Sequence, residues 1–143
     1  MCTYLKSAGL ALAAFTMLAT PALADMMMFK ADMKAAAEVP ANDSKGMGTA
    51  EVTYDTAAKS LKWTVTFSGL TGPAAAAHFH GPAEAGKNAG VVVPLTGTAS
   101  PMTGSATLTD AQAADLMAGK YYINVHTAMH KDGEIRGQVM KAQ

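Results

Sequence analysis

All four histidines of the 143-residue chain lie in two short stretches, His78 with His80 and His126 with His130. If residues 75–80 form a strand, His78 and His80 project from the same face, roughly 6.6 Å apart along the backbone. Two imidazoles at that separation can reach one ion, because metal–nitrogen bonds are about 2.0–2.1 Å long. The His-x-His pair is therefore the first candidate for chemistry in this sequence.

The second stretch has the spacing that would complete such a site. His126 lies in the polar phase of an expected strand over residues 121–127, and that strand could lie beside or across from the first. Three histidines would then meet, with His130 or water in a fourth position. Imidazoles without thiolates suit zinc or copper, and such ligands bind Cu(II) the more tightly. The expected site is thus a copper or zinc site of His78, His80, His126 and His130; the alternative is that these histidines are structural.

Methionines offer a second, weaker argument for a metal. Met26, Met27, Met28 and Met33 crowd one segment, and thioethers are soft ligands for Cu(I). Methionine is also a flexible filler of hydrophobic cores. The sequence favours this second role for the cluster, and leaves Cu(I) binding by Met26–Met28 open.

Other chemistries find little support. The chain has no nucleophile elbow, no glycine-rich phosphate loop and no HExxH motif. Glu134 and Arg136 are two residues apart, so an ion pair on one strand face would be structural. The net charge is +0 and no basic run occurs, which argues against nucleic acid as a partner. We therefore expect a binding protein and not an enzyme.

Short strands separated by Gly, Pro and Asn/Asp turns make up the chain after residue 24. The clearest alternation is residues 61–68, where apolar Leu61, Trp63, Val65 and Phe67 are interleaved with polar residues. The first strand lies in either 26–29 or 35–37, and others are expected at 49–54, 75–80, 91–95, 105–108, 121–127 and 134–140. Thr109 and Gln112 form a capping box that opens a short helix near residues 110–118, ended by Gly119. The predicted fold is an all-β antiparallel β-sandwich, Greek-key-like, or a small barrel.

The N-terminal residues 1–24 have the pattern of a cleavable signal peptide. Lys6 precedes the apolar run 9–19, and residues 21–24 end in a small-x-small pattern. A retained membrane anchor is the alternative, but the run is shorter than the about 20 residues that span a bilayer. The only cysteine, Cys2, lies in this segment. We expect one domain over residues 25–143, periplasmic or secreted, with no membrane attachment after cleavage.

Four motifs resemble those of the chordin-type (CHRD) domain, in the same order and with suitable spacing: Glu38–Pro40, Ala77–Ala83, Tyr122–Ala128 and Gly133–Gln138. The resemblance implies a β-sandwich-like domain of secreted bacterial proteins and of chordin, an extracellular antagonist of growth factors. His78, His80 and His126 match the family's recurrent His-x-His and Asn-Val-His-Thr motifs. His130 departs from the pattern, because the family usually has Asn followed by Pro there.

Three functions follow as hypotheses. The first is an exported copper- or zinc-binding protein that buffers or delivers the ion. The second is a protein-interaction module with structural histidines, in which the Gly81–Gly90 loop or an edge strand faces a protein partner. The third is a redox protein similar to copper–zinc superoxide dismutase, with Arg136 guiding the anion, although the disulfide pair and full ligand set of that enzyme are missing. The sequence carries no signal for an oligomeric state.

Overall fold

The computed structural model describes residues 23–143 of the chain. The expected signal segment, residues 1–24, lies outside the described residues apart from its last two positions. Within residues 23–143, no helix is long and apolar enough to cross a membrane.

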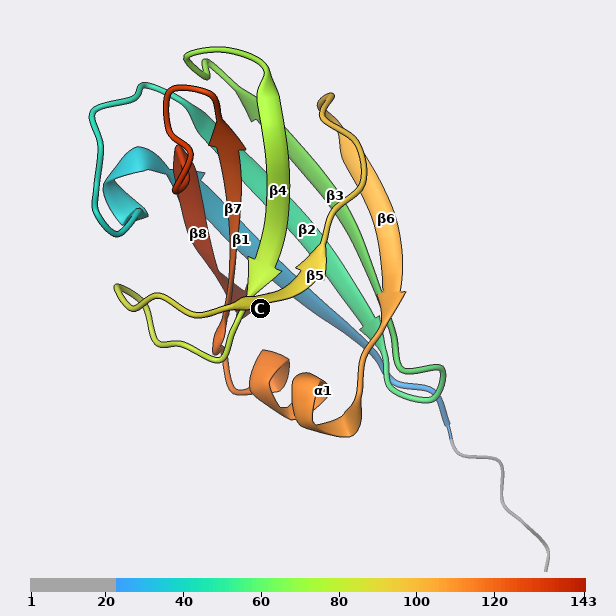
Figure 1. Ribbon diagram of the computed structural model, residues 1–143. Helices are drawn as coiled ribbons and strands as arrows, with labels where there is room; N and C mark the ends of the chain where they lie inside the picture. Colours follow the sequence, from blue (N-terminus) through green and yellow to red (C-terminus); the bar gives the residue numbers. More distant parts are fainter. Residues whose placement is uncertain (1–22) are drawn as a thin grey trace, which may run out of the picture.

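Eight strands and one α-helix build the domain (Figure 1). In chain order the elements are β1 (Met26–Lys34), the 3-10 turn η1 (Ala35–Ala37), β2 (Met47–Asp55), β3 (Ser60–Ser68), β4 (Ala74–His80), β5 (Val91–Pro94), β6 (Met102–Thr107), α1 (Asp110–Met117), β7 (Tyr121–Thr127) and β8 (Ile135–Lys141). The strands form one sheet in the order β5-β4-β7-β8-β1-β2-β3-β6, and every neighbouring pair is antiparallel. The predicted all-β antiparallel fold with one short helix is confirmed.

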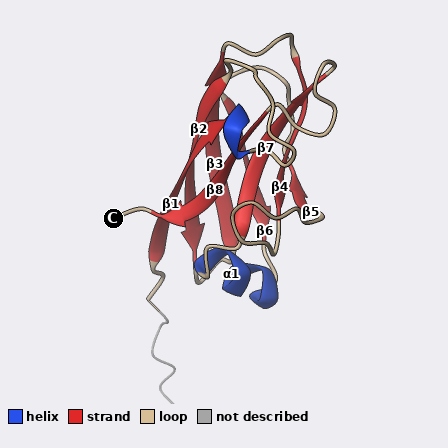
Figure 2. Ribbon diagram, turned by 90° about the vertical axis from the view of Figure 1, so that its left-hand side faces the viewer, coloured by secondary structure: helices blue, strands red, loops and turns tan. Residues whose placement is uncertain are grey.

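The sheet curls around a single hydrophobic core (Figure 2). Strands β3 and β4 are not neighbours in the sheet, yet Trp63 of β3 meets Phe79 of β4 across the core. Their ring centroids are 5.5 Å apart in an edge-to-face arrangement, a favoured geometry for aromatic pairs. The two halves of one continuous sheet therefore face each other, as the two layers of a sandwich do.

The alternation of residues 61–68 is realised in β3. Leu61, Trp63 and Val65 are buried, whereas the polar residues between them are exposed. Trp63 pairs with Gly104 of the neighbouring strand β6, where a Cβ atom would stand 2.6 Å from the indole ring. Glycine at this position leaves room for the largest side chain of the core.

The first strand is longer than either of the two runs proposed for it. Strand β1 extends to Lys34, because Phe29, Ala31 and Met33 alternate inward with polar residues between them. Residues 35–37 form a 3-10 turn instead of a strand. Met26 and Met28 are exposed on the outer face, at 60% and 61%, whereas Met33 is a core residue at 2%.

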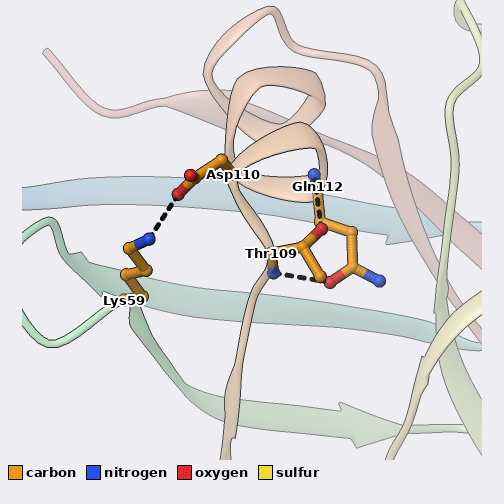
Figure 3. A network of polar contacts seen from close by, with 4 residues as sticks. All are labelled: Lys59, Thr109, Asp110 and Gln112. Carbon is orange, nitrogen blue, oxygen red and sulfur yellow. Dashed lines mark hydrogen bonds and ion pairs between the residues drawn. The ribbon is translucent and has the colours of Figure 1, made fainter.

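Helix α1 lies across one end of the curled sheet (Figure 1), and Figure 3 shows how it begins. The Thr109 hydroxyl accepts from the backbone N–H of Gln112 at 3.2 Å, and the backbone N–H of Thr109 donates to Gln112 Oε1 at 2.9 Å. Lys59, in the β2–β3 turn, forms an ion pair with Asp110 at 2.6 Å. The helix ends before Gly119, whose φ is +72°. The predicted capping box and stop signal are both confirmed.

Candidate metal centre

Strands β4 and β7 bring the two histidine stretches together. They are antiparallel neighbours in which His78 pairs with Asn124, His80 with Tyr122, and Ala76 with His126. The intervening residues are fully buried core residues: Ala77, Phe79, Ile123 and Val125. Because strand residues alternate between faces, the histidines lie on the opposite, outer face of the sheet.

Three of the four candidate histidines converge there. One ring nitrogen from each of His78, His80 and His126 can be chosen so that all three lie within 4.8 Å of one another. His78 Nδ1 is 3.1 Å from His126 Nε2. His130 is not part of this group; it lies in the turn after β7, where its N–H donates to the Thr127 hydroxyl at 3.3 Å and its carbonyl accepts from Gly133 at 3.1 Å.

Backbone carbonyls orient two of the three rings. His80 Nδ1 lies 3.0 Å from the Ala89 carbonyl oxygen, and His126 Nδ1 lies 2.8 Å from that of Lys131. A carbonyl only accepts, so each Nδ1 carries the hydrogen and Nε2 of the neutral ring keeps its lone pair. His78 Nδ1 lies opposite this His126 lone pair, to which the Nδ1–H tautomer of His78 donates. The other tautomer of His78, with its hydrogen on Nε2, leaves Nδ1 with a lone pair for a metal. Metal-ligating histidines are held by such carbonyl contacts, so the arrangement presents the Nε2 atoms of His80 and His126 as ligands.

The environment favours the neutral imidazoles that a metal requires. Burial lowers the pKa of His78, and the neighbouring His126 and His80 lower it further. Burial also lowers the pKa of His80, outweighing the Ala89 carbonyl and the Asn124 amide oxygen, which would favour the protonated ring and raise the pKa. Protons therefore compete less with a metal for these two rings than for a free histidine.

Arg136 and Tyr122 support His80 and were not predicted to do so. Arg136 Nη1 donates to Asn88 Oδ1 at 2.9 Å, and Nη2 donates to the Lys87 carbonyl. The Tyr122 hydroxyl bonds to both the N–H and the carbonyl of Ala89, each at 3.1 Å. The loop that supplies the carbonyl for His80 is thus held in place from β7 and β8.

The suggested pairing of Glu134 with Arg136 does not occur in the described part of the chain. Glu134 is fully buried, and its carboxylate accepts from the hydroxyls of Ser44 at 2.6 Å, Thr127 at 2.5 Å and Thr71 at 2.9 Å, and from the Thr71 N–H at 2.8 Å. Burial alone would raise its pKa, but these hydrogen bonds hold the pKa below its usual value. Glu134 is a structural residue that ties the loops around residues 44 and 71 to the end of β7.

A second buried carboxyl group stands behind the histidines. Glu38 is 5% exposed, and its Oε1 has no hydrogen-bond partner among the described residues. Burial raises its pKa to about 7, against the charge of Arg136 and the amide of Asn124, which lower it. Glu38 is part of the first motif of the resemblance, but nothing in the sequence indicated that it would be buried.

A cavity of about 310 Å³ opens beside His80. Its lining includes Tyr122, Asn124, Asn88 and Asp132. Of the three converging histidines, His80 alone lines this cavity.

Comparison with known proteins identifies the family. The model of the CHRD domain matches residues 29–139, a range that includes the three converging histidines. No curated protein and no solved structure matches the chain. Because the match extends from β1 to β8, the chain belongs to the CHRD domain family.

Proposed function

We propose that this protein is an exported metal-binding protein that holds one copper or zinc ion through His78, His80 and His126, for buffering or delivery. The observation that carries the proposal is the convergence of the three rings, two of which have their Nδ1 atoms engaged by carbonyls. Export rests on the signal-peptide pattern of residues 1–24.

Binding is favoured over redox catalysis by the position of Arg136. A dismutase-like enzyme needs a cationic side chain that attracts an anion to the metal. Arg136, the only arginine in the chain, is 2% exposed and bonds to the loop carbonyl of Lys87 and to Asn88. The Arg136 side chain therefore has a structural role and is not free to attract an anion to the metal.

The alternative is an interaction module with a protein partner on the Gly81–Gly90 loop or on an edge strand, and the structure bears on the loop. The loop already makes contacts within the protein. Ala89 bonds to both Tyr122 and His80, and Asn88 accepts from Arg136. We therefore propose that the loop supports the metal site.

The test is metal content and calorimetric titration of the untagged protein with Cu(II) and Zn(II). We expect one equivalent of metal in the wild type, and its loss in His78→Ala/His80→Ala. The matched control is His130→Ala, which removes a histidine outside the group and should retain the metal. A folded wild type that binds neither ion would contradict the proposal, and circular dichroism of each variant establishes that it is folded.

A further inference from the structure

Asn124 lies in the middle of the three histidines. It is the cross-strand partner of His78, it precedes His126 by two residues on the same face of β7, and its Oδ1 is 3.0 Å from His80 Nε2. The side chain is buried, at 2% exposure. A polar side chain so placed is either a structural partner of His80 or a participant in the site.

The atoms that face each other are both acceptors. His80 Nδ1–H is directed to the Ala89 carbonyl, so Nε2 of the neutral ring presents a lone pair. The Asn124 carbonyl oxygen, also an acceptor, lies opposite this lone pair. Two acceptors at 3.0 Å are complementary to a cation that binds both of them.

The neighbours of Asn124 fix which end of its amide faces His80. The Nδ2 atom lies beside Gly133 and Glu38, since a Cβ atom on Gly133 would stand 2.7 Å from Asn124 Nδ2 and overlap Glu38 Oε1. The carboxyl oxygens of Glu38 attract the amide N–H groups of Asn124. Oδ1 is therefore directed away from Glu38 and toward the histidines.

The separations are those of ligand atoms that share one ion. With bonds of about 2.0–2.1 Å, two ligands of one metal stand roughly 2.9–3.4 Å apart, for geometries from right-angled to tetrahedral. The observed pairs are His80 Nε2 with Asn124 Oδ1 at 3.0 Å and His78 Nδ1 with His126 Nε2 at 3.1 Å. Because one nitrogen from each of the three rings lies within 4.8 Å of the others, we expect side-chain rotations to bring the two pairs onto one ion.

We propose that Asn124 Oδ1 is the fourth ligand, so that the site offers three imidazole nitrogens and one amide oxygen to a divalent ion. This inference rests on the proposed function and deepens it. An amide oxygen is a known weak ligand of copper, and oxygen donors favour harder ions over Cu(I). The site is thus suited to Cu(II) or Zn(II), and less to Cu(I).

The first test uses the wild type. The chain has only three asparagines, Asn42, Asn88 and Asn124, so selective ¹⁵N labelling gives three side-chain amide signals. One equivalent of Zn(II) should shift the Asn124 signal strongly and leave that of Asn42 in place. An unmoved Asn124 signal in zinc-loaded protein overturns the fourth ligand while the proposed function stands. A wild type that binds no metal overturns both.

The second test separates a ligand from a structural residue. In Asn124→Ala, water should fill the vacated position, so the Cu(II) EPR lines should broaden in ¹⁷O-enriched water more than those of the wild type. The affinity should fall about tenfold or more, whereas Asn124→Asp, which keeps an oxygen ligand, should bind and show altered EPR parameters. The control Asn42→Ala should give the wild-type spectrum. Identical spectra and affinities in wild type and Asn124→Ala would overturn the inference.

Discussion

The guanidinium carbon of Arg136 lies 3.4 Å from the centroid of the Tyr122 ring. The same ring stacks on His80, with centroids 4.7 Å apart and planes inclined by 2°. A buried cation over an aromatic face contributes roughly 2 kcal/mol, and here it also connects β8 to a metal-ligand candidate on β4. The stack and the loop contacts of Arg136 form one supporting unit for His80.

Arg136→Lys tests that unit. Lysine keeps the charge but lacks the planar fork that reaches both Asn88 and the Lys87 carbonyl. We expect a loss of about 2–3 kcal/mol in the free energy of unfolding, measured by urea denaturation, together with faster amide hydrogen exchange in residues 81–90. Lys87→Ala is the matched control, because it removes an exposed side chain and keeps the carbonyl that Arg136 uses. Unchanged exchange in the loop of Arg136→Lys would show that the loop is held by other contacts.

Gly133 is a second point at which the site depends on the backbone. Its φ is +126°, and an added Cβ would meet Glu38 Oε1 and Asn124 Nδ2. Gly133→Ala should therefore destabilise the fold by about 2 kcal/mol or more, from backbone strain and from displacement of two buried polar groups. The measurement is denaturant unfolding beside Gly72→Ala, where a Cβ meets nothing within 4 Å. Equal stability of the two variants would contradict this account.

Local sequence patterns predicted those elements whose structure is determined by residues close to one another in the sequence. The alternation of Leu61, Trp63 and Val65 predicted β3, and the pairing of Thr109 with Gln112 predicted the start of α1, since both signals arise from local backbone geometry. The beginning of β1 was recognised but not its end, because the small Ala31 carries a weak alternation signal.

The candidate site was also predicted only in part, because local patterns report strand geometry and not which strands become neighbours. The His-x-His spacing and the polar phase of His126 follow from strand geometry, and they identified three histidines that do converge. The supporting residues Glu38, Ala89 and Lys131 lie in connections between strands. Their contacts depend on which strands become neighbours, and no local pattern specifies that β4 pairs with β7.

Glu134 should make the fold sensitive to acid. Its pKa is lower in the folded protein than its usual value, so its contribution is complete above the unfolded pKa and is lost as the pH falls through the folded pKa. Glu134→Gln should cost about 2–3 kcal/mol at pH 7, because charge-assisted hydrogen bonds from Ser44, Thr71 and Thr127 are weakened. Urea unfolding at pH 7 and in mild acid measures both effects. Glu51→Gln, on an exposed position of β2, should change neither value; a Glu134→Gln variant with wild-type stability at pH 7 would contradict the assignment.

Glu38 should have the opposite effect on stability, making the fold less stable as the pH rises. Burial raises its pKa from 4.5 to about 7, so the folded protein holds a proton that the unfolded chain releases. The stabilising contribution is complete below the unfolded pKa and is lost as the pH rises from about 4.5 to about 7. Glu38→Gln keeps a neutral side chain of the same shape and should remove this loss. We expect the variant to be more stable than the wild type at pH 8 by about 2 kcal/mol, after allowance for solvent screening, and nearly equal to it at pH 4.5.

The measurement is the difference in urea unfolding free energy between wild type and Glu38→Gln at each pH from 4.5 to 8. Taking the difference cancels the titration of His78 and His80, which the two proteins share. The expected curve rises with pH and levels off above about 7. A difference that does not vary with pH would mean that Glu38 is ionised throughout this range, with Arg136 compensating its charge despite burial.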